Sequence, residues 1–329
     1  MDRPMLCTAA GGSGGLLRAL PHRRGVLLGL VGAALAPGAR APDAEEADGC
    51  VEVAPGLWVL PGRIEEASPA NLNAIANTGF IAGRDATAVI DPGGSLPHGR
   101  HLRRAIEARN LPPVRHLVLT HMHPDHVMGA AAFADLRPEV IGHARLPEAL
   151  AQRGAFYAAA LRDQIGPAAE GSAPLAPTRL VQNTAELDLG GRVLLLRAHP
   201  PAHTDNDLTL LDHATGTLWL ADLLFVDHIP TLDGDLGGWL RVLEGLRSDA
   251  ARQAVPGHGP PVVPWPGAAE PERDYLAALR DDTRRAIRAG TGLAEAPGRV
   301  AVTQAARWRL RELHHGRNVS AAYRQLEWE

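Results

Sequence analysis

The chain has 329 residues, 45% of them hydrophobic and 21% charged, a balance typical of a globular protein of one large domain or two fused halves. The 33 basic residues, all of them arginine, and the 37 acidic residues give a formal net charge of −4, which indicates no nucleic-acid partner. Two cysteines are too few for a disulfide scaffold, and the lack of lysine excludes a lysine nucleophile or Schiff base.

Residues 1–41 have the features of an export signal. Arg23 and Arg24 precede an apolar run at residues 25–36, and Ala39-Arg40-Ala41 offers a cleavage site with a small residue at each end. The run is too short to span a bilayer as a stable helix. Paired arginines before a Gly/Ala-rich core are typical of a twin-arginine signal, and the general secretory route is the alternative. We therefore expect a periplasmic protein whose mature form has no membrane span.

The first half of the remaining chain combines short β-rich runs with helical segments. Residues 77–82 and 87–90 flank Gly83-Arg84-Asp85, which is a hairpin signal, and residues 114–119 form a compact apolar strand. Further strands are predicted at 51–53, 57–60 and 140–142, and helices at 98–110, 130–135 and 146–164. The Pro/Gly/Ala-rich residues 166–177 are predicted to form a hinge between two halves.

The second half begins the same order again. Strands are predicted at 187–189, 193–197, 208–211, 218–221 and 254–255, and helices at 238–247 and over most of 265–329. Strands followed by helices, twice over, favour two β-sheets packed on each other with helices outside.

A dense cluster of potential metal ligands follows the strand predicted at 114–119. His121, His123, Asp125 and His126 lie within six residues of one another. Crowded buried imidazoles are unfavourable unless they share a cation, and neutral imidazole and carboxylate are ligands of zinc and similar ions. On an extended loop His121 and His123 point to the same side, whereas Asp125 and His126 lie where the chain turns into a helix and can face a second ion.

Three further polar residues lie at predicted strand ends and can complete two metal sites. His203 lies beyond the strand that ends near residue 197, Asp222 ends the strand at 218–222, and His258 lies between a short strand and a proline turn.

This order and spacing resemble the metallo-β-lactamase superfamily, in the pattern HxHxDH at 121–126, AHTDND at 202–207, an aspartate after a strand and PGHG at 256–259. The resemblance implies an α+β fold: an αββα sandwich at residues 50–264, with a C-terminal helical extension at 265–329 packed on it. It implies one metal bound by His121, His123 and His203, a second bound by Asp125, His126 and His258, and Asp222 bridging both. Asp91 resembles the family's aspartate that supports the metal-binding loop from behind.

Substrate choice is expected to lie in the loops at 61–76, 154–177 and 224–234. His228, on the last of these loops, is a candidate for a substrate contact. The remaining histidines, His314 and His315 among them, are expected to be packing or surface residues.

Three segments resemble a narrower group, the quinoprotein relay system zinc metallohydrolases, which are related to metallohydrolases of sulfur-oxidation clusters. The segments are IANTGFI at 75–81, VIDPGGS at 89–95 and HGRNVSAAY at 315–323. This resemblance implies a role beside a periplasmic quinoprotein dehydrogenase.

The implied activity is that of a hydrolase with two Zn²⁺ ions, with iron or manganese as alternatives. A hydroxide shared by the two ions would attack a small ester, lactone, thioester or amide, and Asp125 would orient it and pass a proton to the leaving group.

Two other functions stay open at the level of sequence. One is a mononuclear iron enzyme that oxidises persulfide sulfur and uses His121, His203 and Asp222. The other is a non-catalytic, metal-containing accessory protein for quinoprotein maturation. The second set of ligands favours the dinuclear hydrolase.

Overall fold

The computed structural model describes residues 48–329. The predicted export signal at 1–41 lies outside the described residues. None of the helices within 48–329 combines the length and hydrophobicity that a bilayer span requires.

The first sheet contains seven strands that follow one another in chain order, from β1 to β7. Its first four strands pair antiparallel, and β4 to β7 pair in parallel. The strands are β1 (Val51–Ala54), β2 (Leu57–Leu60), β3 (Thr78–Ala82), β4 (Thr87–Ile90), β5 (Val114–Leu119), β6 (Glu139–His143) and β7 (Arg179–Val181).

The second sheet contains six strands in the order β13-β12-β11-β10-β9-β8. Only β11 and β12 pair in parallel within this sheet, so their carboxyl ends meet at one edge. The strands are β8 (Thr184–Asp188), β9 (Val193–Ala198), β10 (Leu208–Asp212), β11 (Thr217–Phe225), β12 (Gln253–His258) and β13 (Val263–Pro264).

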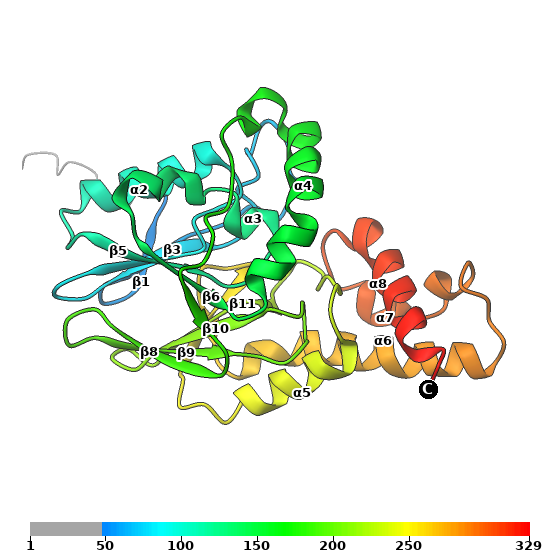
Figure 1. Cartoon of the computed structure of the whole chain (residues 1–329). Helices are drawn as coiled ribbons and strands as arrows, with labels where there is room; N and C mark the ends of the chain where they lie inside the picture. Colours follow the sequence, from blue (N-terminus) through cyan, green and yellow to red (C-terminus); the bar gives the residue numbers. More distant parts are fainter. Residues whose placement is uncertain (1–47) are drawn as a thin grey trace, which may run out of the picture. The chain divides into compact units, whose positions relative to one another are not determined.

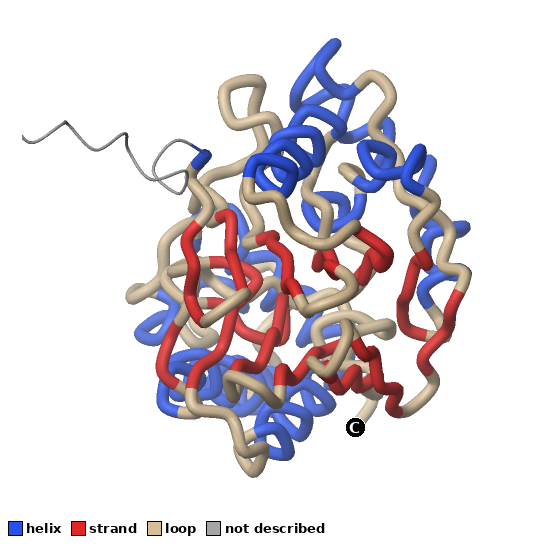
Figure 2. The backbone as a smooth tube through the Cα atoms, turned by 90° about the vertical axis from the view of Figure 1, so that its left-hand side faces the viewer, coloured by secondary structure: helices blue, strands red, loops and turns tan. Residues whose placement is uncertain are grey.

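Helices cover the outer face of each sheet, and Figures 1 and 2 show the strands between two helical layers. Over the first sheet lie α2 (Leu96–Ala108), α3 (Pro124–Val127), η1 (Ala130–Leu136), α4 (Leu146–Ile165) and η2 (Gly166–Ala169). On the second sheet's side lie α5 (Leu236–Leu246), η3 (Gly267–Ala269), α6 (Glu270–Arg288), η4 (Ala296–Gly298), α7 (Val302–Ala305) and α8 (Arg311–Leu326).

Three apolar cores correspond to this layering. The core between the sheets joins residues such as Val59, Ile90 and Val118 of the first sheet to Leu196 and Trp219 of the second. Two further cores lie between each sheet and its helices. Burial of these apolar faces is the main favourable contribution to folding. The order of the layers, helices, sheet, sheet and helices, confirms the αββα sandwich predicted from the sequence.

The predicted hinge at 166–177 is wrong as a boundary between halves. The segment starts with η2 and leads into β7, which still belongs to the first sheet. The chain changes sheets at residues 182–183, between β7 and β8. A smaller difference concerns α2, which begins two residues before the predicted start because the Ser95 hydroxyl accepts a hydrogen bond from the His98 amide.

Helix α6, which packs on the side of the second sheet, carries a fully buried acid, Glu272. Its Oε1 accepts a hydrogen bond from the Phe225 amide at 3.0 Å, and its Oε2 has no hydrogen-bond partner within residues 48–329. Burial raises the pKa of Glu272 well above its ordinary value, and the nearby charge of Asp222 raises it further. The folded protein therefore keeps this carboxyl protonated where the unfolded chain ionises it.

We expect the Glu272→Gln variant to be more stable than the wild type at pH 8 and to differ little at pH 5. The folded-state pKa lies above the unfolded one, so the wild type loses stability as the pH rises toward the folded pKa, and the amide removes that loss. Urea unfolding of both proteins at the two pH values measures the effect. An equal stability difference at pH 5 and pH 8 would contradict a protonated buried carboxyl.

Candidate metal centre

The loop after β5 presents four of the predicted ligands. The chain bends at His121 and Met122 after the strand, and Pro124 opens the short helix α3, whose single turn holds Asp125 and His126. Gly129 follows because the backbone passes close to Pro92 there: an added Cβ would lie 2.3 Å from the Pro92 carbonyl oxygen.

The other three ligands come from the second sheet. His203 lies on the loop between β9 and β10, and His258 is the last residue of β12. Asp222 lies inside β11, which continues to Phe225, so its predicted position at the strand end is corrected. The pairing of β11 with β12 shifts around Ala221, which has a positive φ of 46°, and this irregularity sets the backbone just before Asp222. Gly257 lies beside it, where an added Cβ would be 1.9 Å from Asp222 Oδ1.

One cluster joins His121, His123, His203 and Asp222. His123 Nδ1 lies 3.1 Å from His121 Nε2 and 3.0 Å from His203 Nε2. Asp222 Oδ2 lies 3.7 Å from His121 Nε2 and 3.4 Å from His203 Nε2. Ligands at zinc bond lengths in a tetrahedron are separated by about 3.3–3.4 Å, so these four atoms match the edges of a zinc-sized tetrahedron.

A second cluster joins Asp125, His126 and His258 on the other side of Asp222. Asp125 Oδ2 lies 3.3 Å from His258 Nε2 and 3.7 Å from His126 Nε2. Asp222 contacts both histidines as well, with Oδ1 3.0 Å from His126 Nε2 and Oδ2 3.4 Å from His258 Nε2. Asp222 is thus placed to serve both clusters.

Hydrogen bonds on the far side of each ring fix which nitrogen faces the clusters. His126, His203 and His258 each direct Nδ1 to an oxygen: Asp91 Oδ2 at 2.9 Å, the Thr231 carbonyl at 2.8 Å and the Ile75 carbonyl at 3.0 Å. These acceptors require an N–H, so each Nε2 keeps its lone pair for the cluster.

The two remaining rings follow the same rule. His123 directs Nε2 to Asp233 Oδ2 at 3.2 Å, so its Nδ1 faces the cluster. The Thr120 hydroxyl donates to Asp91 Oδ2 at 2.7 Å and lies 3.1 Å from His121 Nδ1, so it accepts from that nitrogen. Asp91 therefore lies behind both clusters and holds Thr120 and His126.

The buried carboxylates of the two clusters favour positive charge beside them. Burial lowers the pKa of His121 well below its usual range and that of His203 to about 3, so both rings are neutral. Burial also disfavours charge on His258, but Asp222 and Asp125 outweigh it and raise the His258 pKa to about 9. The same balance raises the pKa of His126. Two divalent cations would supply this positive charge instead and displace both protons.

The donor set fits such ions in a second respect. His126 Nε2 and Asp222 Oδ1 are buried, and the 3.0 Å contact between them is not aligned as a hydrogen bond. Neither atom has a hydrogen-bond partner within the described residues. Buried polar atoms left in this way are rare in folded proteins unless a ligand or ion satisfies them. The two clusters together can hold two metal ions.

Four of the seven ligands, His123, Asp125, Asp222 and His258, form the floor of a cavity of about 360 Å³. All three predicted substrate loops contribute to its walls. The loop at 61–76 provides Glu66 and Ile75, the loop at 154–177 provides Gln164, and the loop at 224–234 provides His228 and Asp233. His228 is buried, with its ring centre 4.9 Å from that of His258.

Some residues of the cavity were not singled out from the sequence. Asp233 is 110 residues away from its partner His123 in sequence, so no local pattern indicates their contact. His314, expected to be a packing or surface residue, and Arg317 come from α8 and line the same cavity. The histidine pair at 314–315 and the segment HGRNVSAAY at 315–323 were the sequence signals in α8, and neither indicates a contact with the cavity.

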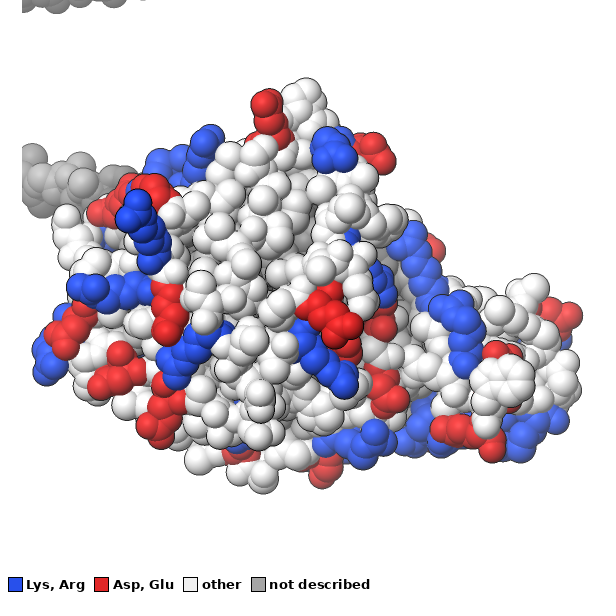
Figure 3. Space-filling view, in the orientation of Figure 1, with Lys and Arg blue, Asp and Glu red and all other residues white. Residues whose placement is uncertain are grey.

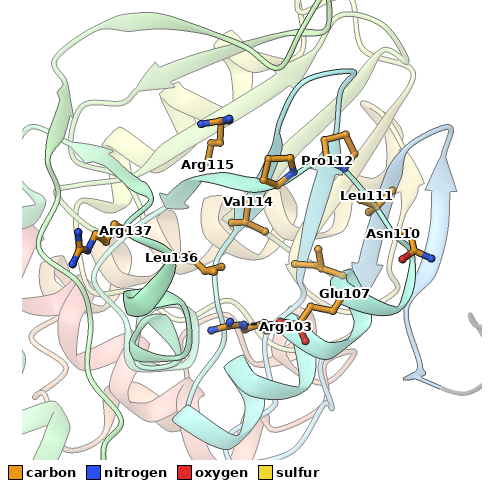
Figure 4. Close-up of a pocket in the computed structure, with 11 residues that line it drawn as sticks. Arg103, Glu107, Asn110, Leu111, Pro112, Val114, Arg115, Leu136 and Arg137 are labelled. Carbon is orange, nitrogen blue, oxygen red and sulfur yellow. Dashed lines mark hydrogen bonds and ion pairs between the residues drawn. The ribbon is translucent and has the colours of Figure 1, made fainter.

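A larger cavity, of about 560 Å³, lies elsewhere (Figure 4). It is formed by the end of α2 and the segment that leads into β5, so it lies at the opposite end of β5 from His121. Its acidic residue Glu107 is paired with Arg103 at 2.9 Å. It contains no cluster of metal ligands among the described residues.

The model of the family described as the metallo-beta-lactamase superfamily matches residues 73–285. The chain belongs to this superfamily. The match covers all seven predicted ligands and extends into α6. The matched region thus contains both His/Asp clusters that can bind metal.

The chain is also similar in sequence to a curated protein, a linear primary-alkylsulfatase from Pseudomonas sp. (strain ATCC 19151). It is 25% identical over 250 residues, which is 64% of this chain and 47% of the relative. The chain thus spans about half the length of the curated relative that it matches.

Solved structures support the fold. A stereoselective inverting sec-alkylsulfatase from Pseudomonas sp. aligns with a TM-score of 0.65 at 18% identity, over 84% of this chain and 50% of that one. A metallo-β-lactamase from Pontibacter korlensis aligns with a TM-score of 0.51 at 17% identity, over 69% of this chain and 94% of that one. At these identities the similarity concerns the fold alone.

Proposed function

We propose that this protein is an exported dinuclear zinc hydrolase that acts on a small ester, lactone, thioester or amide. The observation that carries the proposal is that Asp222 contacts ligands of both clusters beside one cavity. Two zinc ions held there would supply Lewis acidity that polarises a substrate oxygen and acidifies a water molecule.

The chain's own residues have defined tasks in this proposal. The neutral rings of His121 and His203 offer lone pairs, and Asp233 keeps the His123 ring in the matching orientation. Asp125 lines the cavity, and its side chain keeps 13% of its surface exposed. The neighbouring histidines outweigh the effect of burial and lower the Asp125 pKa, which keeps its carboxylate ionised. From its place on the cavity wall the ionised carboxylate would accept a hydrogen bond from water, orient it, and relay a proton to the leaving group.

The complete second cluster supports two ions over the single-iron alternative. An iron enzyme that uses His121, His203 and Asp222 would leave Asp125, His126 and His258 without an assigned task. Those three residues have donor atoms within 4.8 Å of one another.

Export and a link to a periplasmic quinoprotein dehydrogenase are part of the same proposal. Export is supported by the paired arginines and the apolar run within residues 1–41. The quinoprotein link is supported by the segments at 75–81, 89–95 and 315–323, which resemble the quinoprotein relay metallohydrolases.

A sulfate ester is a second candidate substrate. It is favoured by the sequence similarity to the curated protein named linear primary-alkylsulfatase, which extends over 250 residues. Sulfate and carboxylate esters present comparable oxygens to a pair of cations, so the two candidates use the same floor of the cavity.

Metal removal and restoration test the proposal. Purified protein is treated with a chelator, reloaded with zinc, and assayed on 4-nitrophenyl esters, lactones, thioesters, amides and sulfate monoesters. We expect turnover only after reloading, and its loss in His121→Ala. The matched control is His213→Ala, because His213 is exposed on the turn between β10 and β11. Oxygen uptake with persulfides by iron-loaded protein, without ester or amide hydrolysis by zinc-loaded protein, would contradict the proposal.

A further inference from the structure

Helix α8 is fixed on the loop that forms one wall of the cavity. Asn318 is buried, accepts a hydrogen bond from the Leu232 amide at 3.0 Å and donates to the Pro230 carbonyl at 2.6 Å. Two turns further on, Gln325 accepts from the Leu236 amide at 3.0 Å and donates to the Gly234 carbonyl at 2.7 Å. These four bonds set the position of α8 relative to the metal ligands.

The fixed helix brings His314 and Arg317 to the cavity. A row of rings leads there from the floor: His228 lies 4.9 Å from the ligand His258 between ring centres, and His314 lies 5.3 Å from His228. Arg317 follows His314 by three residues, so both side chains lie on one face of α8. Arg317 is exposed and is the only arginine among the residues that line this cavity.

The acidic groups of the cavity walls have other partners. Glu66 Oε1 lies 2.8 Å from His314 Nε2. Asp233 contacts His123 at 3.2 Å and Arg153 at 3.5 Å. Acidic and basic side chains are scattered among uncharged ones over the face of the molecule that Figure 3 shows. Within residues 48–329, however, the guanidinium of Arg317 forms no ion pair. Its charge is therefore available to a molecule that enters the cavity.

We infer that Arg317 binds an anionic group of the substrate, a carboxylate or a sulfate, while the reacting bond lies over the ligand clusters. A guanidinium offers paired N–H donors that match the two oxygens of such a group. The inference rests on the proposed function and narrows its substrate class to oxyanion-bearing molecules. Arg317 lies beyond residues 73–285, so the superfamily match does not supply this contact.

The test compares Arg317→Met with Arg324→Met. Arg324 is the matched control because it is an exposed arginine on α8, two turns along, and does not line the cavity. Zinc-loaded proteins are assayed on 4-nitrophenyl esters whose acyl chains have equal length and end in either a methyl or a carboxylate group. 4-Nitrophenyl sulfate forms the second arm. Binding of glutarate and of inorganic sulfate is measured by calorimetry.

We expect Arg317→Met to raise KM for the anionic ester, and to weaken binding of the preferred anion, by about ten- to a hundredfold. The neutral ester, the zinc content and the Arg324→Met variant should show no such change. The anion whose KM or binding changes more on the Arg317→Met substitution, carboxylate or sulfate, is identified as the group that Arg317 binds.

The outcomes separate this inference from the proposed function. Equal ratios of anionic to neutral turnover in wild type and Arg317→Met, with unchanged anion binding, would overturn the inference and leave the hydrolase intact. Anion binding that depends on Arg317 in a zinc-loaded protein that cleaves no substrate would contradict the hydrolase and support the anion site.

Discussion

The Asp222→Asn variant is expected to hold at most one divalent ion per chain and to lose about a thousandfold or more in kcat/KM. Both carboxylate oxygens of Asp222 face cluster histidines, Oδ1 toward His126 and Oδ2 toward His203 and His258. An amide has the same shape but no charge and only one acceptor oxygen, so at least one cluster loses its shared ligand. Removing several kcal/mol of charge stabilisation from the transition state corresponds to this loss in rate.

Metal content by mass spectrometry and initial rates on the best substrate of the panel measure the effect. Asp205→Asn is the matched control, because Asp205 lies near His203 in sequence but contacts none of the seven ligands: it pairs with Arg145 at 3.7 Å and accepts a hydrogen bond from the Asn206 side chain at 2.8 Å. Two ions per chain and near wild-type turnover in Asp222→Asn would show that Asp222 does not serve both clusters.

The Asp91→Ala variant is expected to lose on the order of 3–5 kcal/mol of stability. Asp91 is fully buried and accepts three hydrogen bonds, from the Thr120 amide at 2.9 Å, the Thr120 hydroxyl at 2.7 Å and His126 Nδ1 at 2.9 Å. Alanine leaves all three donors without a partner. Asp91 also has a positive φ of 51°, which aspartate tolerates better than alanine.

The same substitution should weaken zinc binding at the second cluster by about 10- to 100-fold, because the His126 ring loses the group that orients it. Urea unfolding of the metal-free protein and zinc titration measure the two effects separately. Asp91→Asn keeps the size and tolerates the backbone, so it should be less destabilised than Asp91→Ala while its zinc affinity still falls. Equal stability of wild type and Asp91→Ala would disprove the supporting role of Asp91.

Much of the fold and the ligand set could be predicted because the signals are local. The hairpin around Gly83-Arg84-Asp85 and the strand at 114–119 are encoded in turn residues and compact apolar runs. His121, His123, Asp125 and His126 lie on one loop, so their spacing alone predicts that they can converge.

The rest depends on contacts between distant segments. The extension of β11 past Asp222 arises from its parallel pairing with β12, which no feature of residues 218–222 reveals. The contact of Asp233 with His123, and the arrival of Arg317 at the cavity, both require the second sheet and α8 to be in place. The hinge at 166–177 was misassigned because its Pro/Gly composition also suits a connection within one sheet, here between α4 and β7.

Anomalous diffraction at the zinc edge from crystals of the zinc-loaded protein tests the central claim most directly. We expect two peaks, one among His121, His123 and His203 and one among Asp125, His126 and His258, with Asp222 in contact with both. A single peak remote from Asp222, or no peak at all in protein supplied with zinc, would contradict the dinuclear centre.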